Sequence, residues 1–177
     1  RLSLAIDASG IGLWDWNLAT DAVHHSQLPE LLGLQPEMVN AMLTDLKPRL
    51  HPDDVPVLHA VLVEHLKGHT DGYAVEYRMR HAAGHWIWVE DRGRAVERDA
   101  QGRVLRMLGT RRDITARKQT EELLRESEER LLLALDSASM GTWDWDSETD
   151  SLLWNSRQFE LFGILTEACQ PTGTEAL

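Results

Sequence analysis

The side chains of this sequence that could do chemistry are eight histidines, one cysteine and several carboxylates, some of them adjacent. Acid–base catalysis needs such groups held together in a cleft. The pairs Asp53–Asp54 and Glu90–Asp91 have simpler explanations, because the first falls at an expected helix start and the second within an expected strand. The sequence has no Ser/His/Asp arrangement, glycine-rich phosphate loop or metal-ligand spacing. We therefore predict no catalytic or metal site here, and any catalytic output domain would lie outside this chain.

Composition excludes several classes of function. The net charge is −11, from 29 acidic and 18 basic side chains, which argues against nucleic acid because duplex binding depends on Lys and Arg. No apolar run reaches the ~18 residues that a membrane span needs, and no signal peptide opens the chain. The lone Cys169 forms no internal disulfide and fits a reducing compartment. These features predict a cytoplasmic protein, and the start at Arg1 suggests a piece of a longer one.

The sequence contains an internal repeat. Residues Arg1–Asp21 and Arg130–Asp150 are identical at 11 of 21 positions at a constant offset of 129. A period this long indicates a duplicated domain rather than a solenoid, whose units have ~20–50 residues. The second copy continues to about Gly163 and supplies only a helix, two strands and a short helix. That is too little to bury a core alone, so we expect it to be either poorly ordered or docked on another surface.

Local patterns predict short elements in the first half of the first copy. Apolar residues at helical spacing indicate a helix at Arg1–Ser9, and alternation indicates strands at Gly12–Asn17 and Ala22–Ser26. His51-Pro-Asp-Asp54 is a helix start, because proline suits the first turn and carboxylates favour the positive end of the helix dipole. The helix that follows should end at about Lys67, before a glycine.

Three strands complete the first copy, at Tyr73–Met79, His85–Arg98 and Val104–Ile114. Short turns join them, so neighbouring strands should be antiparallel. The order of two strands, several helices and a three-stranded meander predicts an α+β domain with helices on one face of the sheet.

Several motifs occur in a characteristic order: Gly12-x-Trp-Asp-Trp16, His51-Pro-Asp-Asp54, Tyr77-Arg-Met-Arg80 with Gly84-x-Trp86, and Gly102 followed by Gly109-Thr-x-x-Asp-Ile-Thr115. Together they resemble a PAS domain with its C-terminal PAC motif, most closely the bacterial subclass with a Trp-rich first strand. The resemblance implies a five-stranded antiparallel sheet whose helices lie on one face and enclose a small cavity. It also implies an input or dimerisation module of a sensor histidine kinase or a cyclic-dinucleotide enzyme such as a diguanylate cyclase. We therefore predict a PAS-like sensory domain at 1–115, a helical signalling connector at 116–138 and the N-terminal fragment of a second PAS-like domain at 139–177.

The resemblance raises the question of whether the first copy binds a cofactor. A covalent flavin sensor needs a cysteine beside the ring, and the first copy has none. A haem sensor needs an axial histidine on the long helix, where His59 and His65 fall, but a histidine on an apolar face is more often a hydrogen-bonded core residue. We therefore expect no cofactor, and haem or non-covalent flavin is the alternative. The tryptophan pairs Trp14/Trp16 and Trp86/Trp88 could each wall a cavity or form an exposed face.

The connector should carry the signal. Thr115 can cap a helix that starts near Ala116, and no Gly or Pro occurs from there to Ser137. Asp113, Ile114 and Thr115 then form the junction between sheet and connector, either as a signalling element or as a plain strand end. A heptad seam lies on the connector, formed by Leu124, Ser127, Leu131 and Ala134 and continued by Ala138. A second register uses Leu124, Glu128, Leu131 and Leu135. The seam predicts a parallel homodimer, and the alternative is a solvated spacer.

Two functions from different classes follow. The first is a protein–protein module that relays a change in the sheet to an output domain of the same polypeptide. The second is a receptor for a small molecule, haem or flavin.

Overall fold

The computed structural model describes residues 10–35 and 46–163. The chain divides near Gln119 into two compact units, which are described separately. The predicted helix at Arg1–Ser9 and the stretch from Ile164 to Leu177, with Cys169, lie outside the described residues. Within the described ranges, no helix combines the length and hydropathy that a membrane crossing requires.

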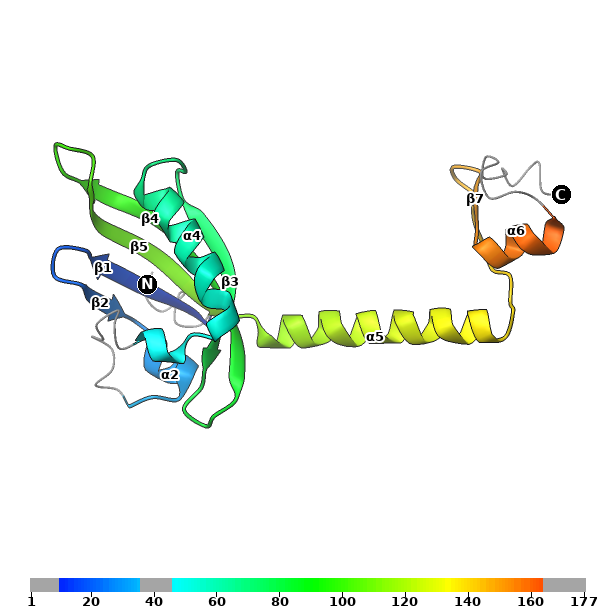
Figure 1. Cartoon of the computed structure of the whole chain (residues 1–177). Coiled ribbons are helices and arrows are strands. Elements are labelled where there is room, and N and C mark those ends of the chain that lie inside the picture. Colours follow the sequence, from blue (N-terminus) through cyan, green and yellow to red (C-terminus); the bar gives the residue numbers. More distant parts are fainter. Residues whose placement is uncertain (1–9, 36–45, 164–177) are drawn as a thin grey trace. The chain divides into compact units, whose positions relative to one another are not determined.

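The first unit contains one antiparallel sheet of five strands (Figure 1). The strands are β1 (Ile11–Asn17), β2 (Ala22–His25), β3 (Tyr73–Arg80), β4 (Trp86–Arg98) and β5 (Val104–Asp113). Their order across the sheet is β2-β1-β5-β4-β3, so the first strand of the chain lies beside the last. This confirms the predicted five-stranded antiparallel sheet, and the predicted strand ends agree within one residue.

The register of the central strands determines which residues face each other. On β4 and β5, Asp91 lies opposite Arg111 and Gly93 opposite Gly109. A side chain at either glycine would overlap the indole of Trp14, which lies across both. The ladder shifts between Ala95 and Arg98, beyond this region. Glycines therefore let a tryptophan from β1 lie flat against the sheet and reach β4.

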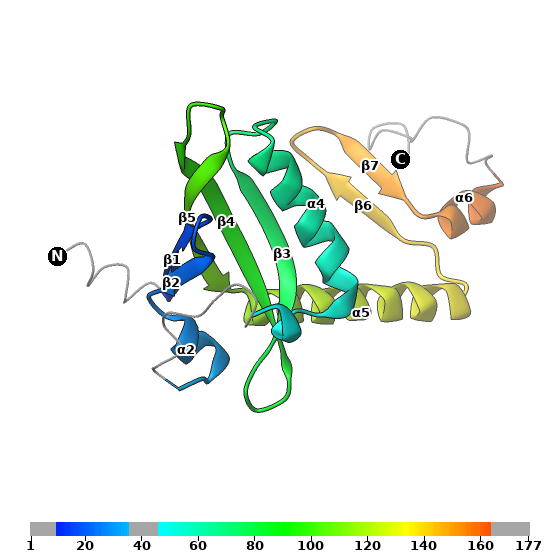
Figure 2. The same ribbon diagram turned by 60° about the vertical axis from the view of Figure 1, so that its left-hand side comes forward.

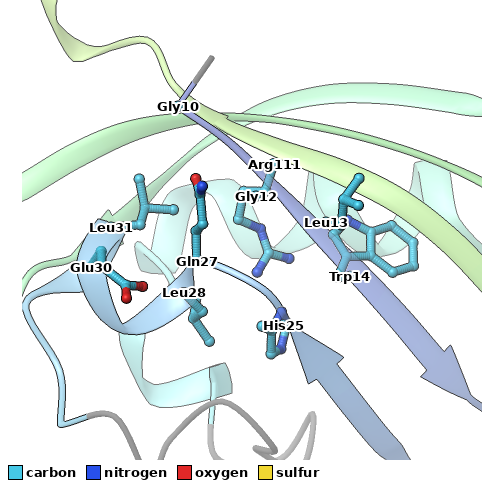
Figure 3. Close-up of a pocket in the computed structure, with 10 residues that line it drawn as sticks. All are labelled: Gly10, Gly12, Leu13, Trp14, His25, Gln27, Leu28, Glu30, Leu31 and Arg111. Carbon is cyan, nitrogen blue, oxygen red and sulfur yellow. The ribbon is translucent and has the colours of Figure 1, made fainter. Parts of the chain in front are cut away.

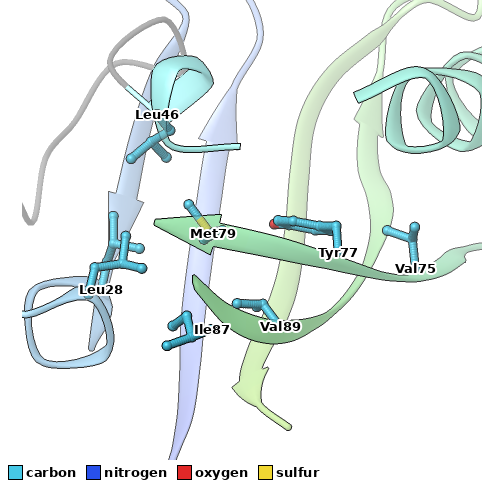
Figure 4. Packing of buried hydrophobic residues seen from close by; sticks show 8 residues of the cluster. Leu28, Leu46, Val75, Tyr77, Met79, Ile87 and Val89 are labelled. Carbon is cyan, nitrogen blue, oxygen red and sulfur yellow. The ribbon is translucent and has the colours of Figure 1, made fainter. Parts of the chain in front are cut away.

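Helices cover one face of this sheet (Figure 2). They are α2 (Leu28–Leu32), α4 (Val55–Leu66) and two 3-10 turns at Lys47–Arg49 and Pro52–Asp54. The strand period of two explains the packing, because Val75, Tyr77 and Met79 on β3 all point inward and are at least nine-tenths buried. They join Leu28 and Leu32 of α2, Leu46, and Ile87 and Val89 of β4 in the main core (Figure 4).

The His51–Asp54 motif starts α4, as predicted, and also fastens it to the sheet. The imidazole of His51 accepts a hydrogen bond from the Asp53 amide, at 3.3 Å. The Asp54 carboxylate accepts from Arg78 on β3 through the backbone N–H (2.8 Å), Nε (2.9 Å) and Nη2 (2.7 Å). These hydrogen bonds from Arg78 lower the pKa of Asp54.

A 23-residue helix, α5 (Thr115–Ser137), follows the sheet. Beyond it, the second unit contains a hairpin of β6 (Trp143–Asp146) and β7 (Ser151–Trp154), then α6 (Ser156–Phe162). Both units therefore show a two-stranded hairpin followed by a short helix.

Candidate functional site

The centre of the first unit is a buried carboxylate. Asp91 on β4 is only 2% exposed and points inward, in phase with Ile87 and Val89. Four side chains donate to it: Trp14 Nε1 from β1 (2.9 Å), Tyr77 Oη from β3 (2.6 Å), Arg111 Nη2 from β5 (2.7 Å) and Tyr73 Oη from β3 (3.4 Å). One carboxylate thus joins β4 to β1, β3 and β5, and a buried charge needs such partners.

Sequence analysis missed this site. Glu90–Asp91 was assigned to an ordinary strand, and neither His25 nor Arg111 was singled out. The alternation along β4 could have revealed it. Asp91 follows Ile87 and Val89 at every second position, which points inward, and a charged residue is exceptional at such a position.

Burial sets the protonation of this region. Burial, together with the nearby Asp91 charge, raises the pKa of Tyr73 and Tyr77 well above the usual range, so both phenols remain donors. Burial and the Arg111 charge lower the pKa of His25 to about 3, so this imidazole is neutral at neutral pH. At the centre of the site, Asp91 and Arg111 form a buried ion pair.

Two buried side-chain polar atoms of the described residues have no hydrogen-bond partner: His25 Nε2 and Arg111 Nη1. Both residues line a cavity of about 230 Å³ between β1, the end of β2 and α2 (Figure 3). They also line a second cavity of about 60 Å³ between the sheet and α4. Natural proteins seldom bury an unpaired donor or acceptor, so such atoms call for an explanation.

The predicted haem ligands do not line either cavity. His65 is fully buried, but Nδ1 lies 3.0 Å from the carbonyl of Thr70 and Nε2 accepts from the amide of Ala95, at 2.9 Å. Both ring nitrogens are engaged, and His59 is exposed. The described residues therefore do not fit a haem iron, and His65 joins the end of α4 to β4 as a hydrogen-bonded core residue. No described group of three or more His, Cys, Asp or Glu is placed to hold a metal ion.

The two tryptophan pairs have different surroundings. Trp14 and Trp16 line the smaller cavity, under α4. Trp86 and Trp88 alternate with buried residues of β4 and so lie on the outer face of the sheet, where the guanidinium of Arg78 is 5.2 Å from the Trp88 ring centroid. The first pair therefore walls a cavity, and the second pair lies on the outer face.

The residues predicted to relay a signal hold the sheet and α5 together. Ile114 is 5% exposed, and its N–H donates to the carbonyl of Trp88, at 2.9 Å. The N–H of Trp88 donates to the Thr115 hydroxyl, at 2.9 Å. The predicted capping role of Thr115 was wrong, because the helix starts at Thr115 itself and its hydroxyl bonds to the neighbouring strand. Asp113 Oδ1 accepts from the N–H of Thr115 instead, at 2.7 Å.

A second contact secures the first turn of α5. Glu76 on β3 accepts from Arg117 Nη2 at 2.5 Å and lies 2.7 Å from Lys118 Nζ. The hydrogen bond from Lys118 lowers the pKa of Glu76 most, and the hydrogen bond from Arg117 lowers it further. The Lys118 ammonium also lies 5.2 Å from the Trp88 ring centroid. The start of α5 is thus held by β3 as well as β4.

The residues of the predicted seam are exposed along α5. Leu124 and Leu131 are each 60% exposed, and Ser127 and Ala134 are also exposed. Beside them, Arg125 forms ion pairs with Glu122 and Glu129 along the same helix. The seam thus presents apolar side chains between charged ones.

The hairpin of the second unit reproduces that of the first in detail. Trp16 Nε1 donates to Asp21 Oδ1 and Trp145 Nε1 to Asp150 Oδ1, both at 3.1 Å, and both aspartates have positive φ. Another hydrogen bond recurs at the same offset of 129, from Leu13 N to Ser26 Oγ and from Thr142 N to Asn155 Oδ1. The surroundings differ, because Trp14 is 5% exposed and the equivalent Trp143 is 64% exposed.

Known proteins show the same fold. The family model described as PAS fold matches residues 24–111. A crystal structure of a sensory box histidine kinase/response regulator from Burkholderia thailandensis is 35% identical, with a TM-score of 0.64 over 74% of this chain and 97% of that one. The N-terminal domain of a diguanylate cyclase with PAS/PAC sensor from Marinobacter aquaeolei is 27% identical, with a TM-score of 0.53 over 61% of this chain and 98% of that one.

Curated relatives extend the comparison. The probable diguanylate cyclase DgcE of Escherichia coli is 27% identical over 56% of this chain, and hybrid signal transduction histidine kinase A of Dictyostelium discoideum is 32% identical over 45%. The chain spans only 9% and 4% of these two proteins. Residues 24–111 therefore belong to the PAS fold family. The subclass and the PAC motif stay predictions.

The buried carboxylate yields the first testable prediction. Asp91→Asn keeps the size and an acceptor oxygen but leaves the Arg111 charge buried and unpaired, which should cost about 3–5 kcal/mol of unfolding free energy. Asp15→Asn is the matched control, because Asp15 pairs with Arg106 at a partly exposed site, and such pairs contribute about 0.2–1 kcal/mol. Urea unfolding measures both variants. Equal losses would show that Asp91 is not the centre of the core.

Proposed function

We propose that this chain is the input and relay part of a larger cytoplasmic signalling protein. A change in the PAS sheet passes through Asp113, Ile114 and Thr115 into α5, and from there to an output domain of the same polypeptide. The relatives named as a diguanylate cyclase and a histidine kinase support output domains of these two kinds. The acidic composition supports protein and small-molecule partners rather than nucleic acid.

The observation that carries the proposal is the double hydrogen bond to Trp88. Its N–H binds Thr115 and its carbonyl binds Ile114, so one residue of β4 holds the last residue before α5 and the first within it. A displacement of β4 along β5 must either move the start of the helix or break these bonds. This arrangement supports a mechanical link at the junction rather than a plain strand end.

The second prediction tests the link through Glu76. Glu76→Gln removes the charge that holds Arg117 and Lys118, and two partly exposed ion pairs together contribute roughly 0.5–1.5 kcal/mol. Amide-exchange protection from Lys118 to Thr120 should fall about two- to tenfold while the strands keep theirs. Glu122→Gln is the control, because Glu122 pairs with Arg125 further along the same helix. Unchanged protection in Glu76→Gln, or the same loss in Glu122→Gln, would contradict the relay.

We also propose that two copies associate in parallel through α5. The exposed Leu124 and Leu131 with Ser127 and Ala134 form an apolar seam between charged residues, as in a coiled coil. The seam from Leu124 to Ala134 covers only about two heptads, so the helix alone should give modest affinity.

The third prediction concerns this dimer. Leu124→Glu with Leu131→Glu places charges in the seam and should abolish concentration-dependent association in sedimentation experiments. Leu132→Glu with Leu133→Glu is the matched control, because these leucines are also exposed but point away from the seam. A parent chain that stays monomeric at high concentration, or a seam variant that dimerises like the parent, would leave α5 a spacer.

The second unit is proposed to be the beginning of a second PAS domain. Its hairpin repeats the hydrogen bonds of the first, and its exposed Trp143 and Trp145 correspond to tryptophans that the first unit packs under α4. Burying large exposed aromatic side chains is energetically favourable, so we expect the surface around Trp143 and Trp145 to dock against a further protein segment.

A receptor function is the second candidate. The unpaired nitrogens of His25 and Arg111 at the 230 Å³ cavity favour a small polar molecule over haem or flavin.

A further inference from the structure

We propose that the cavity between β1 and α2 binds a small organic monocarboxylate through Arg111 and His25. This inference deepens the proposed sensory function, and its signalling part rests on that function. The binding part stands on the cavity alone. The carboxylate oxygens would accept hydrogen bonds from Arg111 Nη1 and from Nε2 of the neutral His25.

The unpaired atoms carry the first step. His25 is only 2% exposed, and its Nε2 has no hydrogen-bond partner. Arg111 uses Nε and Nη2 to hold Asp91, which leaves Nη1 unpaired. Figure 3 shows the guanidinium and the imidazole turned toward the same space. Two residues that line one cavity thus each carry a buried nitrogen without a partner, and an unpaired buried donor costs stability until something accepts from it.

The chemistry of the donors selects the ligand. A guanidinium N–H forms its strongest hydrogen bonds with carboxylate oxygens, and the neutral imidazole can donate Nε2–H beside it. Leu13, Leu28 and Leu31 form apolar walls suited to a hydrocarbon substituent. The exposed carboxylate of Glu30 at the edge disfavours a second negative charge.

The size of the cavity limits the ligand. Its volume of about 230 Å³ lies below the ~300–1,000 Å³ of pockets for drug-sized molecules. A carboxylic acid with a short chain or one ring fits, whereas a flavin or a haem is too large. The ligand is therefore a small metabolite.

The second unit supports the assignment by contrast. At the offset of 129, Trp154 occupies the place of His25 and stacks on Phe162, with ring centroids 5.0 Å apart. The hairpin recurs, but the imidazole does not. The site is therefore a property of the first copy and not of the hairpin itself.

The position of Arg111 connects this site to the junction. Arg111 lies on β5 two residues before Asp113, and β5 continues directly into α5. A carboxylate that shares Arg111 with Asp91 would draw the guanidinium toward α2. The end of β5, which leads into Ile114 and Thr115, would then shift with the guanidinium.

The test uses benzoate and its uncharged analogue benzamide with the whole chain. NMR follows the indole N–H resonance of Trp14, whose side chain lines the cavity. Benzoate should shift it along a saturating curve, and benzamide should bind at least tenfold more weakly. His25→Leu keeps the Asp91–Arg111 pair and should weaken benzoate binding at least tenfold. His24→Leu is the matched control and should not, because neighbouring strand residues point to opposite faces.

The outcomes separate the two proposals. Absence of saturation at tens of millimolar benzoate would overturn the carboxylate site, leaving the two nitrogens to bind water. Equal binding of benzamide, or of benzoate to His25→Leu, would also overturn it. Benzoate binding with unchanged amide exchange from Lys118 to Thr120 would support the site and contradict the relay.

Discussion

The fold depends on burying one negatively charged side chain on the inner face of the sheet. Asp91 is 2% exposed, and its burial is tolerable only because donors from β1, β3 and β5 converge on it. That requirement explains residues which otherwise look unrelated. Gly93 and Gly109 leave room for the Trp14 indole, and the register places Arg111 opposite the carboxylate. The same geometry leaves one nitrogen of Arg111 unpaired, and Arg111 also lines the cavity beside α2.

The same strands that hold the buried charge also hold the start of α5. β4 carries Asp91 inward and Trp88 outward, and the backbone of Trp88 binds Ile114 and Thr115. β3 contributes Tyr77 to the carboxylate from its inner face and Glu76 to Arg117 and Lys118 from its outer face. Because adjacent residues of a strand point to opposite faces, β3 and β4 each join the buried carboxylate on the inner face to the start of α5 on the outer face.

Periodicity predicted the strands, α4 and the helical connector, because alternation and helical spacing depend on neighbouring residues alone. The buried site was missed for the opposite reason, since Asp91, Arg111 and Trp14 converge only through strand pairing that brings residue 14 beside residue 109. Thr115 shows the same limit, because its hydroxyl bonds to Trp88, 27 residues away, rather than to its own helix. His65 was correctly expected to be a hydrogen-bonded core residue, although its partner Ala95 could not be predicted.

The central claim is that the buried carboxylate and the junction form one cooperative unit. Native-state hydrogen exchange by NMR can compare two protons: the indole N–H of Trp14, which binds Asp91, and the backbone N–H of Ile114, which binds Trp88. We expect both protons to exchange only through global unfolding of the first unit, with equal free energies of exchange that fall together as urea is added. An Ile114 amide that exchanges at a much lower free energy, independent of urea, while the Trp14 indole stays protected would contradict this claim.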